Sequence, residues 1–324
     1  MDSIDEICSQ IRKLTDRVVQ KNLTDGMLFS GGLDTSIVAF VASKINPELE
    51  AYTVAFENSP ALDLKYAKLM ANVLNLKHTI KFFGEEEMHS AIQDVIKVLK
   101  VFDPMDIRNS VASYVGLKAA KENGIKAVMT GDGLDELLGG YSWLFHLNEK
   151  ELKEYLSNMW QTMQFTSIPM AESLGIVSKP PFLDPEFKSF AYSVDTKLMI
   201  RRERDEIWGK WIMRKAYEGL LPDEIVWRKK IPLEFGSGTT VFPQVFSEKI
   251  SDKYFQEKVK KYQESDEVTI RDKEHLFYYE IFRSRFGVPS EVFKDKEGKQ
   301  CPHCKARGGN PKSKFCKVCG AYPI

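Results

Sequence analysis

In the first 130 residues of the chain, stretches with apolar residues at helical spacing alternate with short apolar runs typical of strands. Residues 4–21 carry Ile7, Ile11, Leu14 and Val18 at helical spacing, which predicts an amphipathic helix. Short apolar or β-branched runs then predict strands at 26–30, 51–56, 77–83 and 125–130, and the patterns between them predict helices at 34–45, 62–75, 86–100 and 108–122. Strands that alternate with helices form parallel sheets covered on both faces. The pattern therefore predicts an α/β domain built on a parallel sheet.

The pattern changes after about residue 145 and stays mostly helical to about residue 286. A proline-rich stretch interrupts it at 178–185, and a glycine-containing segment at 230–238 is expected to be a flexible loop. We expect one domain over 1–290, with an α/β part at about 1–144 and a mostly helical part at 145–290, then a charged linker at 291–300 and a compact tail at 301–324.

The first predicted strand leads directly into Ser30-Gly31-Gly32, and a helical pattern begins just after it. The N-terminus of a helix holds anions, because its N–H groups are unpaired and the helix dipole is positive there. Two glycines let the backbone approach a phosphate closely, and the hydroxyls of Thr35 and Ser36 add donors. The Asp34 carboxylate indicates a bound cation beside the phosphates. The spacing is not that of a Walker A loop, and the alternative is an ordinary turn of small residues.

The fourth predicted strand ends in a second unusual turn, which begins Gly131-Asp132 and continues through Asp135 and Glu136 to Gly139-Gly140. Three carboxylates within five residues repel one another unless a cation neutralises them. The carboxyl ends of parallel strands share one edge of a sheet, so both turns should open onto one crevice. With Asp34 opposite, the turn predicts a magnesium site that bridges phosphate oxygens. The alternative is a solvated acidic turn that caps the next helix.

Taken together, these motifs resemble the synthetase domain of asparagine synthetases, which contain an N-type ATP pyrophosphatase (PP-loop) fold. The family loop reads Ser-Gly-Gly-Leu-Asp-Ser-Ser, and its acidic motif ends in Gly-Gly-Tyr. The similarity covers roughly residues 5–286 and continues in family order through further segments at 106–108, 181–184, 221–230 and 273–279. The resemblance implies an adenine nucleotide alpha-hydrolase-like α/β fold with a helical C-terminal extension.

The resemblance also implies a chemistry, in which ATP adenylates a carboxylate with release of pyrophosphate and ammonia then displaces AMP to give an amide. By motif position, Asp34 and Asp135 would bind Mg²⁺, Asp132 matches the family's catalytic glutamate, and Lys230 matches the lysine that neutralises pyrophosphate. Arg108 is a candidate clamp for a substrate carboxylate or phosphate, and the alternative for Lys230 and Arg108 is an exposed surface side chain. The expected ATP and pyrophosphate contacts are Leu28, Ser30, Gly31, Gly32, Asp34, Thr35, Ser36, Val54 and Gly131, with Leu28 and Val54 near the adenine.

Two departures from the family pattern affect the expected substrates. The family's glutaminase nucleophile is an N-terminal cysteine, whereas residue 2 here is Asp2 and Cys8 lies on the apolar face of a predicted helix. We therefore expect ammonia, free or from a separate glutaminase subunit, as the nitrogen donor. The family's Glu-Ala-Arg before Pro-Phe-Leu-Asp is also replaced, within residues 176–184. The acceptor is therefore expected to be aspartate or a related acid.

The tail carries a separate chemistry in two Cys-x-x-Cys pairs, Cys301/Cys304 and Cys316/Cys319. Four thiolates at this spacing form a tetrahedral Zn²⁺ site, and in so short a segment the metal replaces a hydrophobic core. Disulfides or a redox pair are the alternatives. The surrounding lysines and arginines raise the possibility of docking to tRNA or to a protein.

Composition limits the remaining choices only weakly. The 324 residues contain 46 Lys plus Arg and 46 Asp plus Glu, so the overall charge does not point to a nucleic-acid partner. The sequence lacks an apolar run long enough for a membrane span, and we expect a cytoplasmic protein without a membrane partner. The favoured function is an ATP-dependent amidoligase. The alternatives are a PP-loop adenylase that modifies tRNA and a nucleotide-binding protein without turnover.

Overall fold

The computed structural model describes residues 3–295, 298–308 and 313–324. Asp2 and small parts of the expected linker and tail lie outside these ranges. The chain divides into two compact units. The first unit comprises Met1–Val54, Leu62–Lys81 and Gly116–Pro232, and the second comprises Ala55–Ala61, Phe82–Val115 and Leu233–Ile324.

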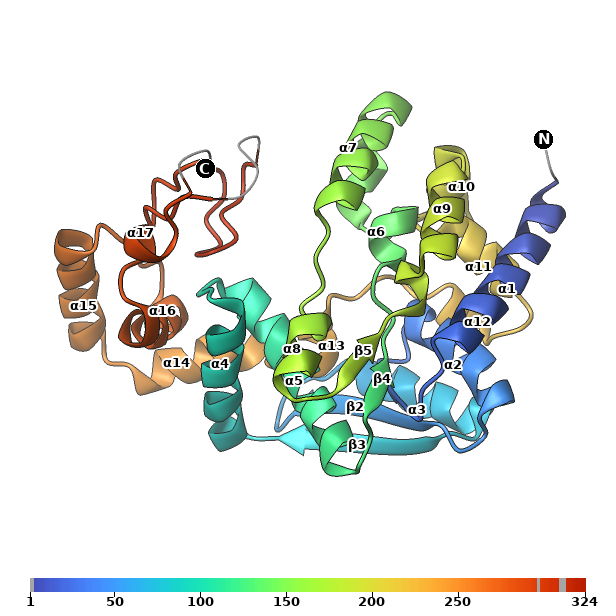
Figure 1. Cartoon of the computed structure of the whole chain (residues 1–324), viewed down its shortest axis with the longest axis horizontal. Helices are drawn as coiled ribbons and strands as arrows, with labels where there is room; N and C mark the ends of the chain where they lie inside the picture. Colours follow the sequence, from blue (N-terminus) through green and yellow to red (C-terminus); the bar gives the residue numbers. More distant parts are fainter. Residues whose placement is uncertain (1–2, 296–297, 309–312) are drawn as a thin grey trace. The chain divides into compact units, whose positions relative to one another are not determined.

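A five-stranded sheet in the order β3-β2-β1-β4-β5 organises the α/β part (Figure 1). Its strands are β1 (Gly26–Leu28), β2 (Glu50–Phe56), β3 (Lys77–Phe83), β4 (Ala127–Met129) and β5 (Val177–Lys179). β1 pairs in parallel with β2 and β4, and β4 pairs in parallel with β5. The strand order changes direction between β1 and β4, which is where open α/β sheets bind ligands. The four expected strands are present, whereas β5 lies at the start of the stretch that was expected only to interrupt the helical pattern.

The helices before and between these strands follow the apolar pattern of the sequence. They are α1 (Ile4–Lys21), α2 (Leu33–Ile45), α3 (Asp63–Leu74), α4 (Glu85–Leu99) and α5 (Pro104–Glu122). A capping box fixes the start of α1, because the Ser3 hydroxyl accepts from the Glu6 N–H and the Glu6 carboxylate accepts from the Ser3 N–H. The apolar face of α1 packs against α2 and α11 (Trp211–Tyr217). Cys8 is buried in this core, as expected.

The rest of the first unit is mostly helical, as the sequence predicts. Its elements are α6 (Leu134–Leu138), a 3₁₀ turn at Ser142–His146, α7 (Glu149–Thr162), α8 (Ser167–Ser173), a 3₁₀ turn at Pro181–Leu183, α9 (Pro185–Ser193), α10 (Thr196–Met199), α11 and α12 (Asp223–Val226). An antiparallel hairpin of β6 (Arg201–Glu203) and β7 (Glu206–Trp208) was not expected. Its strands are only three residues long, which is too short for a recognisable alternation.

The second unit gathers its C-terminal helices around an aromatic core. They are α13 (Leu233–Ser237), a 3₁₀ turn at Thr239–Val241, α14 (Phe242–Lys249), α15 (Asp252–Ser265), α16 (Lys273–Phe286) and α17 (Pro289–Val292). The rings of Tyr279 and Phe282 both pack against Phe102, with centroids 5.0 and 5.1 Å from that of Phe102. The expected loop at 230–238 is partly wrong, because α13 occupies Leu233–Ser237.

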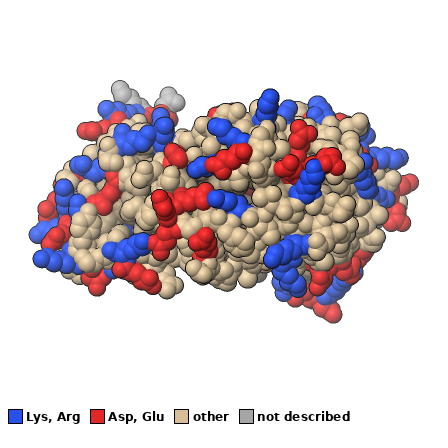
Figure 2. Space-filling view, turned by 90° about the horizontal axis from the view of Figure 1, so that it is seen from below, with Lys and Arg blue, Asp and Glu red and all other residues tan. Residues whose placement is uncertain are grey.

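Acidic and basic side chains alternate over the face drawn in Figure 2, in keeping with the balanced composition. In the described parts of the chain, no helix combines the length and apolar character that crossing a membrane requires.

Candidate functional site

The loop between β1 and α2 has the features of an anion-binding turn. Gly32 is the N-cap of α2, and within the described residues no side chain caps this helix. The N–H groups of its first turn therefore keep their donor capacity for a ligand. The Ser30 hydroxyl lies 3.1 Å from that of Thr35, and the buried Ser36 hydroxyl has no hydrogen-bond partner among the described residues. These donors fit a phosphate group.

Glycine is required at one position of this loop and favoured by close packing at a second position beside it. Gly31 has a φ of +65°, and a Cβ there would lie 2.3 Å from the backbone N of Ala67 on α3. A Cβ on Gly131, at the end of β4, would lie 3.0 Å from Thr35 Cγ2 and 3.2 Å from Asp34 Cβ. The Ser-Gly-Gly loop and the acidic turn are therefore in contact, as the shared sheet edge requires.

Lys210 joins the two expected metal-binding carboxylates. Its Nζ lies 2.6 Å from Asp34 Oδ1 and 2.6 Å from Asp135 Oδ1, and the lysine side chain is only 3% exposed. Lys230 Nζ lies 2.5 Å from the other oxygen of Asp135. The structure thus brings Asp34, Asp135 and Lys230 together and adds a second lysine that the sequence motifs did not indicate.

The two carboxylates differ in their electrostatic setting. Burial would raise the pKa of Asp135, but the charges of Lys210 and Lys230 outweigh it and hold that pKa below its usual range. Burial dominates at Asp34 and raises its pKa, although Lys210 opposes the effect. Carboxylate oxygens are the ligands that Mg²⁺ prefers, so the magnesium site expected at this pair stays a prediction that the residue types suit.

Asp132 occupies a different environment in the same turn. Its carboxylate accepts hydrogen bonds from the hydroxyls of Thr130, at 2.9 Å, and Ser167. Burial raises the pKa of Asp132, and the two hydroxyls only partly offset this. A carboxyl group held in this way is suited to proton transfer or to hydrogen bonding with an acceptor. Its catalytic role remains a prediction.

The two residues expected near adenine also lie together. A Cβ on Gly116 would lie 2.8 Å from Leu28 Cδ2 and 3.2 Å from Val54 Cγ1, so both side chains contact the same turn of α5. Leu28 ends β1 and Val54 lies in β2, which places them on adjacent strands. Their contact with a nucleotide is untested.

Arg108 lies in the second unit, in the early part of α5. Its Nη1 lies 3.4 Å from Glu274 Oε2, and the two side chains are 18% and 3% exposed. Burial raises the pKa of Glu274 to about 7, although Arg108 and the Tyr278 hydroxyl oppose the effect. Arg108 is therefore a half-buried residue with a carboxylate partner rather than an exposed arginine at a helix start, and its part in binding substrate stays a prediction.

The backbone around Lys210 explains why the acidic motif ends in two glycines. Lys210 is the N-cap of α11 with φ +53°, and its N–H donates to Leu138 O at 3.1 Å. A Cβ on the preceding Gly209 would lie 2.2 Å from Gly139 O, and one on Gly140 would lie 1.7 Å from Asp135 Oδ1. The turn therefore allows α11 to approach closely enough for Lys210 to reach both carboxylates.

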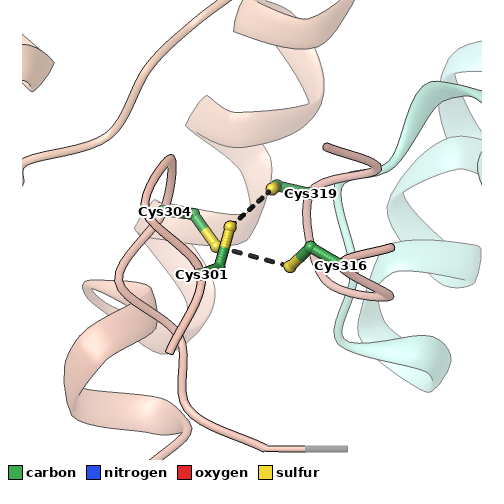
Figure 3. Close-up of side chains that lie close together, drawn as sticks. All are labelled: Cys301, Cys304, Cys316 and Cys319. Carbon is green, nitrogen blue, oxygen red and sulfur yellow. Dashed lines mark hydrogen bonds between the residues drawn. The ribbon is translucent and has the colours of Figure 1, made fainter. Parts of the chain in front are cut away.

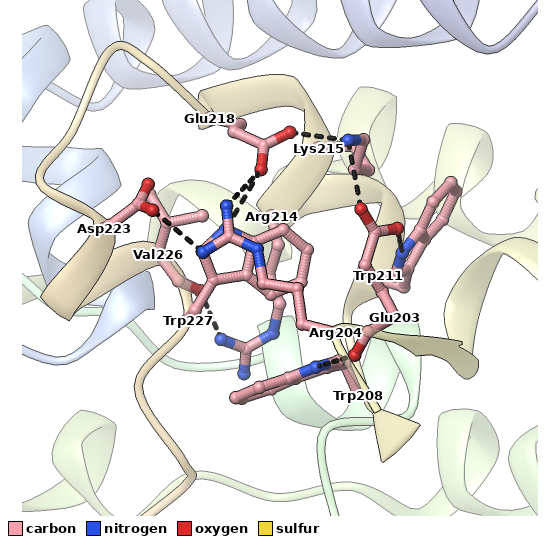
Figure 4. Close-up of polar contacts among 10 residues, drawn as sticks. All are labelled: Glu203, Arg204, Trp208, Trp211, Arg214, Lys215, Glu218, Asp223, Val226 and Trp227. Atoms are coloured by element: carbon pink, nitrogen blue, oxygen red, sulfur yellow. Dashed lines mark hydrogen bonds and ion pairs between the residues drawn. The ribbon is translucent and has the colours of Figure 1, made fainter. Parts of the chain in front are cut away.

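Arg214 connects the two lysine-bearing segments through backbone carbonyls, and Figure 4 shows its contact with Val226. Its guanidinium donates to Gly209 O at 2.9 Å, to Val226 O, and to Arg228 O at 3.1 Å. It is 3% exposed, and burial lowers its pKa to about 10. Gly209 precedes Lys210, and Arg228 lies two residues before Lys230. Arg214 thus fixes the backbone beside both lysines.

The four cysteines of the tail form a compact cluster (Figure 3). All four sulfur atoms lie within 4.8 Å of one another, the residues are buried, and none of them forms a disulfide. The Cys301–Cys319 and Cys304–Cys316 sulfur pairs are each separated by 3.7 Å. Tetrahedral Zn²⁺ with bonds of about 2.3 Å requires sulfur separations of about 3.8 Å. The cluster therefore fits a zinc ion.

The family model described as asparagine synthase matches residues 10–174 and 150–301, which together cover most of the chain. The chain belongs to the asparagine synthase family. The parallel sheet, the helical C-terminal region and the cysteine cluster agree with the PP-loop fold and the ribbon expected from its sequence. The family match thus confirms the resemblance seen in the sequence motifs.

Individual curated relatives of this chain are named asparagine synthetases. Asparagine synthetase B, glutamine-hydrolyzing, of Escherichia coli (strain K12) is 30% identical over 308 residues, which span 86% of this chain and 53% of the relative. The glutamine-hydrolyzing asparagine synthetase of Zea mays is 33% identical over 70% of this chain and 42% of its own length. The chain thus spans about half the length of the curated relatives it matches. A solved NMN synthetase from Francisella tularensis aligns over 63% of this chain and all of its own, but its TM-score of 0.30 and 13% identity are too low to inform the fold.

Proposed function

We propose that this chain is an ATP-dependent amidoligase of the asparagine synthetase type. A substrate carboxylate oxygen would attack the α-phosphorus of ATP, and the bond from that phosphorus to pyrophosphate would break. Ammonia would then attack the acyl carbon of the adenylate, with loss of a proton and release of AMP, to give the amide.

The proposal is supported above all by the grouping of Asp34, Asp135, Lys210 and Lys230 where the strand order changes direction. Asp34 and Asp135 would hold magnesium, which would neutralise phosphate charge and polarise the phosphate to be attacked. The first turn of α2 and the Ser36 hydroxyl would bind phosphate oxygens. Lys230 would stabilise charge that develops on pyrophosphate.

Lys230 fits this role because its side chain is partly exposed. Its side chain is 37% exposed, whereas that of Lys210 is 3% exposed. A partly exposed lysine can leave Asp135 for a phosphate when ligand enters, whereas Lys210 stays anchored at the helix start. We assign the electrostatic role during adenylation to Lys230 and the resting neutralisation of the two carboxylates to Lys210.

The acceptor is proposed to be aspartate or a related acid, and the nitrogen donor to be ammonia, free or from a separate glutaminase. The reported relatives are named asparagine synthetases, which favours amide formation over adenylation of an RNA base. The tail is proposed to bind one Zn²⁺ through its four cysteines.

The test is to incubate the chain with Mg-ATP, ammonium and single candidate acids, and to separate the nucleotide products by chromatography. We expect AMP and pyrophosphate in equal amounts, dependent on the acid, and their loss in Asp34→Asn. An Asp16→Asn control removes a carboxylate from α1 and should leave the products unchanged. ADP and phosphate as products would exclude this chemistry. A parallel reaction with bulk tRNA in place of the acid tests the RNA-modifying alternative.

A further inference from the structure

The cysteine cluster of the tail is hydrogen-bonded to the corner where α4 ends and α5 begins. The Phe102 N–H donates to Val318 O at 2.7 Å, one residue before Cys319. Gly320 packs directly on the next residue of that corner, because a Cβ there would lie 2.0 Å from Asp103 Oδ1. Gly320 has a φ of +73°, which favours glycine in this close approach.

The same cluster is held by the segment that leads into α16. The Arg271 guanidinium donates to Gly320 O at 2.8 Å and to Cys319 O at 2.7 Å. The Thr269 N–H donates to His303 O at 2.7 Å, between the first two cysteines. Both Cys-x-x-Cys turns are therefore bound to the body of the second unit through backbone carbonyls within one residue of a cysteine.

These two segments begin the helices that carry Arg108 and its partner. Phe102 lies two residues before α5, which bears Arg108, and Arg271 lies two residues before α16, which bears Glu274. The ring of His275, next to Glu274, stacks on Phe102 with centroids 5.3 Å apart, and its Nδ1 accepts from the Arg271 N–H at 3.2 Å. The first turns of α5 and α16 are thus bound both to each other and to the cysteine turns.

We propose that the zinc-loaded tail positions the Arg108–Glu274 pair, and that Arg271 is the residue that connects the metal turns to that pair. The physical reason is that a tail this short has little core of its own, so its carbonyls hold fixed positions only when a metal joins the four sulfur atoms. Without metal, Phe102 and Arg271 lose ordered acceptors, and the starts of both helices become free to open. This inference rests on the proposed function only for the statement that Arg108 contacts the substrate acid.

Hydrogen exchange followed by mass spectrometry tests the structural part without any substrate. Removal of zinc with a chelator should reduce amide protection in peptides covering 100–108 and 268–276 as well as in the tail, and zinc alone should restore it. Peptides from α1 and α2 serve as the internal reference and should not change. Loss of protection confined to the tail would overturn the proposal.

A variant series separates the connecting role of Arg271 from metal binding. Arg271→Ala should keep one zinc per chain and yet lose protection at 100–108 and 268–276. Arg271→Lys should restore part of it, because the ammonium group can still donate to one of the two carbonyls. Arg285→Ala removes an exposed arginine from the last turn of α16, the helix that follows Arg271, and should match the wild type. Wild-type protection in zinc-loaded Arg271→Ala would exclude a connecting role for this residue.

A kinetic arm tests the link to the substrate. With the acid that supports pyrophosphate release, Arg271→Ala should raise the KM for that acid several-fold and leave the KM for ATP unchanged. If hydrogen exchange changes in Arg271→Ala but the KM for the acid does not, Arg108 does not contact the acid. That result would contradict the substrate role of Arg108 and leave the attachment of the tail to the Arg108–Glu274 pair standing. If no acid supports turnover, the proposed function fails while the exchange experiment still decides the present inference.

Discussion

Lys210 lies between Asp34 and Asp135, with its Nζ 2.6 Å from one oxygen of each carboxylate. This single cation offsets the repulsion between two carboxylates that would otherwise be buried close together. Carboxylate oxygens of this kind are also ligands that Mg²⁺ prefers.

Replacing Lys210 with methionine should destabilise the chain because it leaves buried carboxylate charge poorly compensated. Loss of one partner of a buried ion pair costs about 3–5 kcal/mol. Urea unfolding should show a decrease of that order in magnesium-free buffer, and added Mg²⁺ should recover more stability in Lys210→Met than in the wild type. Lys65→Met is the control, because Lys65 is 70% exposed and its pair with Glu224 is worth about 1 kcal/mol at most. Equal stability of the two variants would contradict the role of Lys210.

Lys230→Ala should separate chemistry from binding. Charge on the leaving pyrophosphate develops in the transition state, so removing its stabiliser should lower turnover about 10²–10³-fold and change ATP affinity much less. Asp34→Asn should instead weaken the binding of Mg-ATP. Calorimetric ATP titrations beside pyrophosphate-release rates distinguish the two effects. Wild-type turnover in Lys230→Ala would mean that this lysine only neutralises Asp135.

Arg214→Lys should reduce both stability and turnover, although the substituted residue never contacts a ligand in this scheme. An ammonium group cannot reproduce the planar fork that serves the carbonyls of Gly209, Val226 and Arg228, and each carbonyl left unpaired costs about 1–3 kcal/mol. Pyrophosphate release measured below the melting transition should fall because the backbone beside Lys210 and Lys230 is displaced.

Arg204→Lys is the matched control for Arg214→Lys. Arg214 lies over the ring of Trp208 and Arg204 over that of Trp227. The Arg204 side chain, however, is 45% exposed, and its partners are the carboxylates of Glu218 and Asp223 (Figure 4). Exposed pairs of this kind contribute little to stability, because solvent screens the charges. Thermal melts and turnover should therefore change little, and equal losses in both variants would show that Arg214 acts only through general stability.

Glu274 should make stability depend on pH. Its pKa is raised by burial from 4.5 to about 7 in the folded chain, so folding favours the protonated form. The contribution of protonated Glu274 to the free energy of unfolding is fully present below about pH 4.5. It is lost as the pH rises through about 7, and the loss amounts to about 3 kcal/mol. Glu274→Gln should match the wild type at pH 4.5 and become more stable than it at pH 8. Urea unfolding at the two pH values measures the difference, and Glu224→Gln, at an exposed position, should show no such crossover.

The sequence alone determined the features that depend on local pattern. The strand, the glycine turn and α2 follow from apolar runs and from Gly31, whose positive φ is a property of the turn itself. The Cys-x-x-Cys spacing likewise specifies a four-sulfur cluster, since each pair lies on one tight turn. The contact between the Ser-Gly-Gly loop and the acidic turn followed from the rule that parallel strands share a carboxyl edge.

Only the tertiary structure decided which distant charges meet. Lys210 lies 176 residues from Asp34 along the chain, and its role depends on how closely Gly209 approaches Gly139, which no local pattern encodes. The three carbonyls bound by Arg214 are equally invisible in sequence, because any backbone carbonyl can accept. The attachment of the cysteine turns to Phe102 and Arg271 could not be predicted from the sequence either. It uses backbone carbonyls as acceptors, and only the fold sets where those carbonyls lie.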